Sequence, residues 1–294
     1  MLGITLARAR RTTLAERILV LVRDEHRPWW QHELAAIRPE QVLVQSGNRG
    51  TGLALLHALL HVHAHEPDAC VVVLPSDHAV DDEAVMASCI LEAVDEARLH
   101  AGQVVLIGAP AAVVDPSLGW IIPAHEETGR TRQVAGFVEK PGPQEAAACV
   151  RRGGLRNTLI LSGRVPALLK IYALQTLEPR ATTDAPDEVS HATIPGLAAI
   201  HAQVPAMDLS RDILQRSPRW LRVLPLPECG WTDIGTLERL EAWWASHPSS
   251  YAEVRQFGVF PVAARARSPR EHALVPAGVV VATGTDGPGR GDAA

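Results

Sequence analysis

The chain has 294 residues, of which 47% are hydrophobic and 21% are charged, a composition that predicts a globular protein with enough apolar residues for a large core. Its formal net charge of -5 argues against a nucleic-acid-binding protein, because such proteins usually carry a basic excess. No apolar run is long enough to span a membrane, and no signal-peptide pattern is present. We therefore expect a cytoplasmic protein that binds neither nucleic acid nor membrane.

The cysteines give a further indication of the compartment. Cys70, Cys89, Cys149 and Cys229 lie far apart in the sequence, and none belongs to a C-x-x-C pair. This spacing predicts reduced, mostly buried thiols, as is usual in the cytoplasm.

The first elements along the chain are a helix and two strands. Leu2, Leu6 and Ala9 lie at helical spacing, so the chain is expected to begin with an amphipathic helix. Strands are expected at residues 17–22 and 41–45, where aliphatic residues dominate. Nothing before the helix reads as a strand.

A glycine-containing loop at residues 45–52 separates the second strand from a helical run at residues 53–65. A strand, a loop and a helix start in this order can present free backbone N–H groups to an anion or to the polar edge of a base. The loop matches neither G-x-x-x-x-G-K-[ST] nor G-x-G-x-x-G. Taken alone, a tight turn is the other interpretation.

Residues 71–74 are four aliphatic residues in a row, three of them β-branched, which predicts a strand buried on both faces. Pro75 ends its hydrogen-bonded ladder because proline has no N–H group. Ser76 and Asp77 follow at the carboxyl end of the strand, where open α/β sheets bind ligands. The Asp77 carboxylate could hold a divalent metal there, or it could cap the helix expected from about residue 83.

The remainder of the chain alternates between strands and helices. Further strands are expected at residues 104–108, 119–123, 133–141, 155–161, 221–226 and 278–282, and further helices at residues 83–99, 144–152, 165–176 and 236–244. This alternation predicts an α/β fold with a doubly wound, mostly parallel, Rossmann-like sheet. The strands near Trp120 and Phe137 predict a small antiparallel insert, and residues 285–294 read as a disordered tail.

Six short segments follow one another in an order that carries more information than any one of them. They are N-R-G-T at residues 48–51, V-L-P-S-D-H at 73–78, G-W-I at 119–121, F-V-E-K-P at 137–141, R-N-T at 156–158 and G-W-T-D-I-G at 230–235. Together they resemble the sugar-1-phosphate nucleotidyltransferases, and specifically the bacterial mannose-1-phosphate guanylyltransferases. The resemblance covers about residues 1–245 as one α/β domain and leaves residues 246–294 as a C-terminal extension.

The resemblance implies a role for each matching residue. It implies that Asp77 and Asp233 are catalytic carboxylates that hold Mg²⁺, and that the catalytic Lys140 binds the sugar phosphate. The residues implied for nucleotide binding follow two strand ends: Gln45, Asn48, Arg49, Gly50, Thr51 and Ser76. The residues implied for the sugar pocket are Gly119, Glu139 and Asn157.

The implied reaction joins two anions. A phosphate oxygen of mannose 1-phosphate attacks the α-phosphorus of GTP, which yields GDP-mannose and releases pyrophosphate. The protein must therefore neutralise charge and align the oxygens. Two carboxylates suit Mg²⁺, which binds phosphate oxygens, and a lysine supplies a compact charge for the sugar phosphate. The resemblance also allows a homodimer.

Two departures from the family pattern bear on function. Arg156 stands where the family usually has tryptophan. The family also begins with a central strand and a G-G-x-G-T-R-L loop that binds the triphosphate, and this sequence has neither. We therefore expect an N-terminally truncated domain with a gap in its sheet and exposed apolar surface beside the gap. A catalytically degenerate nucleotide-sugar-binding or regulatory subunit, and a transferase for another nucleotide or hexose 1-phosphate, are the alternatives.

Overall fold

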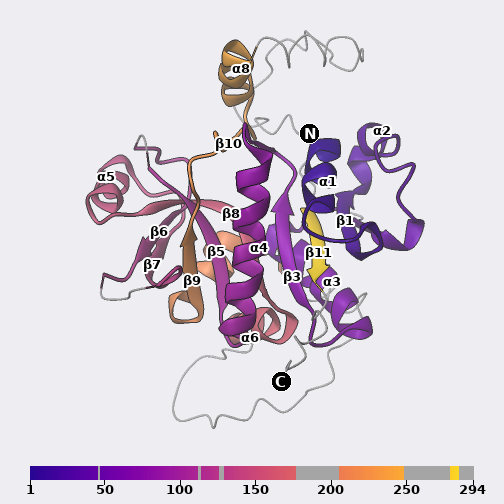
Figure 1. Ribbon diagram of the computed structural model, residues 1–294, viewed down its shortest axis with the longest axis horizontal. Coiled ribbons are helices and arrows are strands. Elements are labelled where there is room, and N and C mark those ends of the chain that lie inside the picture. Colours follow the sequence, from indigo (N-terminus) through magenta and orange to yellow (C-terminus); the bar gives the residue numbers. More distant parts are fainter. Residues whose placement is uncertain (46, 112–113, 126–128, 177–204, 248–278, 285–294) are drawn as a thin grey trace, which may run out of the picture.

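The computed structural model describes residues 1–45, 47–111, 114–125, 129–176 and 205–247, and residues 279–284 as a strand (Figure 1). These residues form a nine-stranded sheet and a separate two-stranded one. The strands of the large sheet, from one edge to the other, are β2 (Val42–Gln45), β1 (Ile18–Arg23), β11 (Val279–Gly284), β3 (Cys70–Pro75), β8 (Leu155–Arg164), β5 (Val104–Ala109), β9 (Leu221–Pro225), β7 (Arg132–Val138) and β6 (Trp120–Pro123).

Most strands of the sheet share one direction, as expected for a mostly parallel sheet, although reversed strands lie among them. Six strands, β2, β1, β3, β5, β9 and β6, run in one direction, and β11, β8 and β7 run in the other. Because the three reversed strands lie between the others, only the pairs β1–β2 and β5–β9 are parallel neighbours. The carboxyl ends of β1, β2, β3 and β5 lie in one row along the sheet, at the ends of the strands. We call this row of strand ends the carboxyl edge. The amino end of β8 meets the same edge.

Helices cover both faces of the sheet, which confirms the α/β class. On one face, α1 (Leu2–Arg10) and α4 (Glu83–Leu99) enclose a core that includes Val72 and Leu74 of β3. On the other face, α3 (Gly50–His65) and α6 (Val165–Thr176) enclose a core that includes Val71 and Val73. Figure 1 shows α4 crossing the middle of the sheet. The unbroken aliphatic run of β3 is thus buried on both faces, as its sequence predicts.

The antiparallel insert is continuous with the main sheet. Strands β6 and β7 pair with each other, and they join the sheet through β8 and β9. The side chains of Trp120 and Ile122 pack against Ala146 and Cys149 of α5 (Pro143–Arg151). All four cysteines are buried and unpaired, as predicted. Among the described residues, no helix has the length and apolarity needed to cross a bilayer.

The expected gap in the sheet is not present, and that expectation was wrong. Strand β11 lies between β1 and β3 and pairs antiparallel with both of them. It satisfies the inner N–H and C=O groups of both neighbours, and Val20 and Val72 beside it are buried. A β-branched V-V-V run suits this central position, and backbone pairing accepts a strand of either direction. The tail expected at residues 285–294 lies outside the described residues.

Helix α1 is tied to the body of the protein by a buried ion pair. The Arg8 side chain is fully buried, and its Nε and Nη2 atoms donate to the two carboxylate oxygens of Glu83 at 2.9 and 2.7 Å. Nη2 also lies 3.4 Å from the carbonyl oxygen of His78. Because a buried guanidinium cannot shed its charge, the structure depends on its partner carboxylate.

Glu83→Gln is expected to lower the free energy of unfolding by about 3 kcal/mol, because it leaves the Arg8 charge buried without a counter-charge. Urea denaturation measures this loss. Glu66→Gln is the matched control, since Glu66 pairs with Arg17 at 3.0 Å but is 47% exposed, and it should cost within about 0.5 kcal/mol. Equal losses in the two variants would contradict the anchoring role of Arg8.

Candidate functional site

Two carboxylates predicted from the sequence meet at the carboxyl edge. Asp77 follows β3 and Ser76, and Asp233 lies on β10 (Thr232–Asp233), which pairs antiparallel with β4 (His78–Ala79). The Ile234 N–H group donates to the Asp77 carbonyl oxygen at 2.9 Å. A Cβ atom placed on Gly235 would lie 3.0 Å from Asp77 Oδ2 and 3.0 Å from Asp233 Oδ1. The carboxylates therefore flank Gly235 and converge, as predicted.

The electrostatics of this pair favour a cation. Burial, and then the negative charge of Asp233, raise the pKa of Asp77 to about 6. Both side chains are half-buried, so water only partly screens their repulsion. The described residues contain no cluster of three or more His, Cys, Asp or Glu side chains that could enclose a metal. Two carboxylates nevertheless fit Mg²⁺, which usually keeps waters and takes substrate phosphate oxygens as its other ligands.

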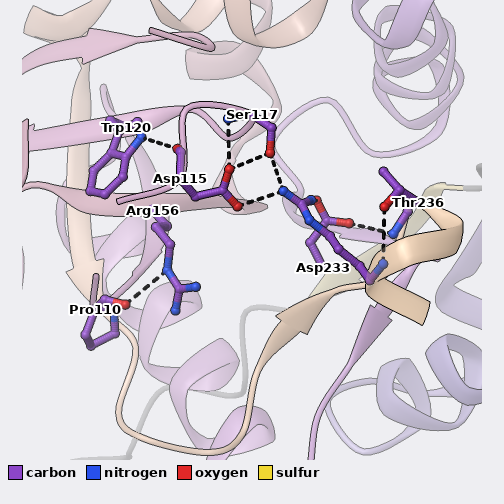
Figure 2. Close-up of polar contacts among 9 residues, drawn as sticks. Pro110, Asp115, Ser117, Trp120, Arg156, Asp233 and Thr236 are labelled. Atoms are coloured by element: carbon purple, nitrogen blue, oxygen red, sulfur yellow. Dashed lines mark hydrogen bonds and ion pairs between the residues drawn. The ribbon is translucent and has the colours of Figure 1, made fainter. Parts of the chain in front are cut away.

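A cation from the protein itself lies beside Asp233. Arg239, in the first turn of α8 (Leu237–Ser246), donates from Nη1 to Asp233 Oδ2 at 2.6 Å. Its Nη2 atom donates to Asp115 Oδ2 at 2.8 Å and also contacts Ser117 Oγ. Figure 2 shows Asp115 and Ser117 close together, with Asp233 facing them from the side of Thr236. Thr236 caps α8 by accepting the Arg239 N–H group at 3.3 Å, which fixes where the side chain begins.

Sequence reasoning missed both Arg239 and Asp115. Asp115 belongs to the loop after β5, and its carbonyl oxygen accepts the Trp120 indole N–H at 2.9 Å. Its carboxylate accepts the Ser117 N–H at 2.9 Å. An aspartate two residues before a serine reads only as a turn, so no signal in the sequence pointed to its contact with α8.

Arg156, which replaces the family's usual tryptophan, lies near the same edge (Figure 2). Its guanidinium stands over the Trp231 ring, 5.5 Å from the ring centroid. Its Nε donates to the Pro110 carbonyl oxygen at 3.1 Å. Arg156 therefore forms a cation–π contact with the tryptophan of the G-W-T-D-I-G segment.

The three residues predicted for a sugar pocket come together. A Cβ on Gly119 would lie 2.6 Å from Glu139 Oε2 and 3.4 Å from the Asn157 Cβ. The Asn157 N–H donates to the Gly119 carbonyl at 2.8 Å, and its Oδ1 accepts the Leu159 N–H at 3.1 Å. Burial raises the pKa of Glu139, while the Ser210 hydroxyl hydrogen-bonds to its carboxylate. A side chain at position 119 would fill the space between the two polar groups.

A bulge in β8 sets the position of Asn157. The register with β5 shifts between Leu106 and Gly108, and Leu159 has a φ of +56°, in the left-handed region that strains a residue with a side chain. The Thr158 hydroxyl donates to the Ile107 carbonyl at 2.6 Å, which holds the bulged strand against its neighbour. Such irregularities recur beside functional sites.

Lys140 is exposed and follows the end of β7. Its φ of +47° lies in the left-handed region, which is unusual for a residue with a long side chain. Among the described contacts, none joins Lys140 to Asp77 or Asp233. The strained backbone at an exposed lysine favours the binding interpretation over a plain solvated charge.

The predicted nucleotide loop is held by the chain around Met207. The Met207 N–H donates to the Arg49 carbonyl at 3.0 Å, and the Met207 carbonyl accepts the Gly52 N–H at 2.8 Å. The Thr51 hydroxyl accepts the Leu209 N–H at 3.1 Å. Gly50, where α3 begins, has a φ of +83°. The Arg49 carbonyl and the Thr51 hydroxyl thus hold the loop against the chain around Met207, a structural role that the sequence did not reveal.

The other residues predicted for the nucleotide differ in burial and in hydrogen bonding. The Gln45 side chain is buried, and its Nε2 atom has no hydrogen-bond partner among the described residues. Asn48 is exposed, and its Oδ1 accepts the Gly50 N–H at 3.2 Å. Ser76, also predicted for the nucleotide, is buried next to Asp77. A buried amide without a partner is costly, so Gln45 is the most informative of these residues.

Comparison with known proteins now decides the family. The sequence profile of the family described as Nucleotidyl transferase matches residues 1–247. The chain belongs to the nucleotidyltransferase family.

Curated relatives of this nucleotidyltransferase include the alginate biosynthesis protein AlgA of Pseudomonas putida. It is 25% identical over 247 residues, which cover 78% of this chain and 47% of that protein. The mannose-1-phosphate guanylyltransferase ManC of Salmonella typhimurium is 26% identical over 247 residues, covering 76% of this chain and 48% of ManC. The chain thus spans about half the length of the curated relatives it matches.

Solved structures support the same fold. A structure described as a mannose-1-phosphate geranyltransferase from Thermus thermophilus superposes with a TM-score of 0.64 at 23% identity, covering 79% of this nucleotidyltransferase and 65% of that chain. A structure described as a mannose-6-phosphate isomerase from Helicobacter pylori has a TM-score of 0.60 at 16% identity, covering 79% and 90%. At these identities the likeness establishes the fold alone.

Asp77→Asn is expected to stabilise the ligand-free nucleotidyltransferase in a pH-dependent way. The pKa of Asp77 rises from 3.8 to about 6 on folding, so ionised Asp77 opposes folding. The penalty is absent below the unfolded pKa and complete above the folded one. The gain should therefore be small at pH 4, close to the unfolded pKa, and reach at most about 3 kcal/mol above pH 7.

Chemical denaturation across this pH range measures the gain. Asp95→Asn serves as the control, because Asp95 is 78% exposed and its replacement should change stability by about 0.5 kcal/mol or less. A destabilised Asp77→Asn at neutral pH would contradict the cost that burial and the Asp233 charge impose on ionised Asp77.

Proposed function

We propose that this nucleotidyltransferase joins GTP to mannose 1-phosphate and forms GDP-mannose and pyrophosphate. The convergence of Asp77 and Asp233 at the carboxyl edge is the observation that carries the proposal. The grouping of Gly119, Glu139 and Asn157 at the amino end of β8 adds to it. The names of relatives support the choice of substrates, since ManC is a mannose-1-phosphate guanylyltransferase.

The chain's own residues would divide the work as follows. Asp77 and Asp233 hold Mg²⁺, which supplies positive charge to the phosphates when bound. Lys140 binds the phosphate of mannose 1-phosphate as a compact cation. The Glu139 carboxylate accepts hydrogen bonds from sugar hydroxyls, and the Asn157 amide donates to them. These bonds orient the attacking phosphate.

The bonds change in a single displacement. One phosphate oxygen of mannose 1-phosphate forms a bond to the α-phosphorus of GTP. The bond from that phosphorus to the bridging oxygen of the β-phosphate breaks, and pyrophosphate leaves with the electron pair. Catalysis of this type rests on alignment and charge neutralisation. Gln45, with its buried amide, and Asn48 would recognise the nucleobase.

Strand β11 favours a second candidate, a nucleotide-sugar-binding or regulatory subunit without turnover. It occupies a central sheet position, where the resemblance to the family led us to expect the gap left by a missing strand that carries the triphosphate-binding loop. Because β11 is antiparallel to β1 and β3, its amino end, and not its carboxyl end, meets the carboxyl edge. A loop that follows β11 would therefore leave at the opposite edge of the sheet.

Pyrophosphate release separates these candidates. The full chain is assayed with Mg²⁺, each of the four nucleoside triphosphates, and either mannose 1-phosphate or glucose 1-phosphate. We expect release with GTP and mannose 1-phosphate above all other pairs. Preferential release with another pair would show that GTP and mannose 1-phosphate are not the substrates. If no pair releases pyrophosphate but calorimetry detects binding of GDP-mannose, the regulatory subunit is favoured.

Lys140→Ala is expected to raise the KM for mannose 1-phosphate and to lower kcat/KM by at least about 10-fold, with little change in the KM for GTP. Lys170→Ala is a matched control, because Lys170 is the only other lysine in the sequence. It lies over the Trp220 ring and not beside Glu139. Steady-state kinetics measure the difference, and thermal melts should shift little because both side chains are exposed. If Lys140→Ala has the same kcat and KM values as the parent, Lys140 does not bind the sugar phosphate.

A further inference from the structure

Both carboxylate oxygens of Asp233 accept a hydrogen bond from the protein itself. Its Oδ1 accepts the Gly235 N–H at 2.7 Å, and its Oδ2 accepts Arg239 Nη1 at 2.6 Å. Asp233 and Arg239 are only 22% and 24% exposed, so their attraction is screened less than that of a surface pair. A divalent cation approaching Asp233 therefore meets a guanidinium on the same carboxylate.

We infer that Arg239 is a resident counter-ion that a divalent cation must displace from Asp233, so that Arg239 weakens cation binding in the ligand-free protein. The inference rests on the proposed function, because it takes Asp77 and Asp233 as the cation ligands. The guanidinium is a fixed positive charge. It offsets the repulsion between the two carboxylates until a cation takes over that task.

Arg239 has a second anchor that allows it to leave Asp233. Its Nη2 atom is bound to Asp115 at 2.8 Å. Asp115 is itself fixed through its bonds from the Ser117 N–H and the Trp120 indole. The guanidinium can therefore release Asp233 and keep one carboxylate partner. A planar, forked donor freed on one side is also suited to bind phosphate oxygens, which arrive with the nucleotide.

The fold of α8 does not depend on this ion pair alone. Leu240 of α8 packs with Ala79 and Ile234, and Trp243 and Trp244 pack against the same small cluster. Thr236 caps the helix independently of the Arg239 side chain. Arg239→Gln should therefore leave α8 in place while it removes the charge beside Asp233.

The test is a titration of the ligand-free full chain with Mn²⁺, followed by electron paramagnetic resonance of the free ion. Arg239→Gln is expected to bind Mn²⁺ more tightly than the parent, by about 5-fold to 150-fold, the usual range for coupling between two binding events. Arg130→Gln is the matched control, because Arg130 pairs with Glu92 at 2.9 Å at an exposed position. It should leave the Mn²⁺ affinity unchanged.

Unchanged or weaker Mn²⁺ binding in Arg239→Gln would overturn the inference and leave Arg239 as a residue that only positions Asp233. Asp233→Asn distinguishes this failure from failure of the cation site. If Asp233→Asn weakens Mn²⁺ binding and Arg239→Gln does not strengthen it, only the inference about Arg239 fails. If Asp233→Asn binds as the parent does, both the cation site and the inference are overturned. Should circular dichroism show that Arg239→Gln is unfolded, Arg239→Ala is titrated against the same expectation.

Discussion

The close approach of two carboxylates is the constraint on which the rest of the site depends. A pair of two-residue strands, β4 and β10, places Asp233 beside Asp77, although the two residues lie far apart in the sequence. Burial of Asp77, together with the like charge of Asp233 beside it, destabilises the ionised carboxylate, and the raised pKa of Asp77 reflects that cost. The protein retains the arrangement because Arg239 and the Gly235 N–H group stabilise the Asp233 carboxylate.

This arrangement links the fold to the proposed chemistry. Phosphate groups are anions, so two carboxylates alone would repel them, and a cation must stand between protein and substrate. The same strand pairing that creates the repulsion also connects the carboxyl edge to α8, which supplies Arg239. Helix α8 lies above this edge in Figure 1, beside β10. The structure thus brings the positive charge of Arg239 to the place where the proposed divalent cation would bind.

The sequence predicted the elements whose chemistry is local. The aliphatic run of β3, followed by Pro75 and Asp77, identified both a buried strand and a residue at its carboxyl end. The resemblance carried by the short segments implied that Gly119, Glu139 and Asn157 line one sugar pocket, and the structure brings the three residues together.

Features that arise from contacts between distant segments were not predicted. Asp115 and Arg239 meet only because the loop after β5 and the start of α8 converge in the folded chain. A strand was expected at residues 278–282, but its position between β1 and β3 was not, because a V-V-V run specifies a strand and not its neighbours. Sequence periodicity therefore defined the elements, while backbone pairing across the sheet decided where they lie.

The most direct test of the account is the position of a bound cation. Crystals of the full chain grown with Mn²⁺ and GDP-mannose would locate the metal by its anomalous scattering. The account predicts one strong peak in contact with carboxylate oxygens of both Asp77 and Asp233 and with the diphosphate. A diphosphate bound elsewhere, or a metal that touches neither carboxylate, would contradict it.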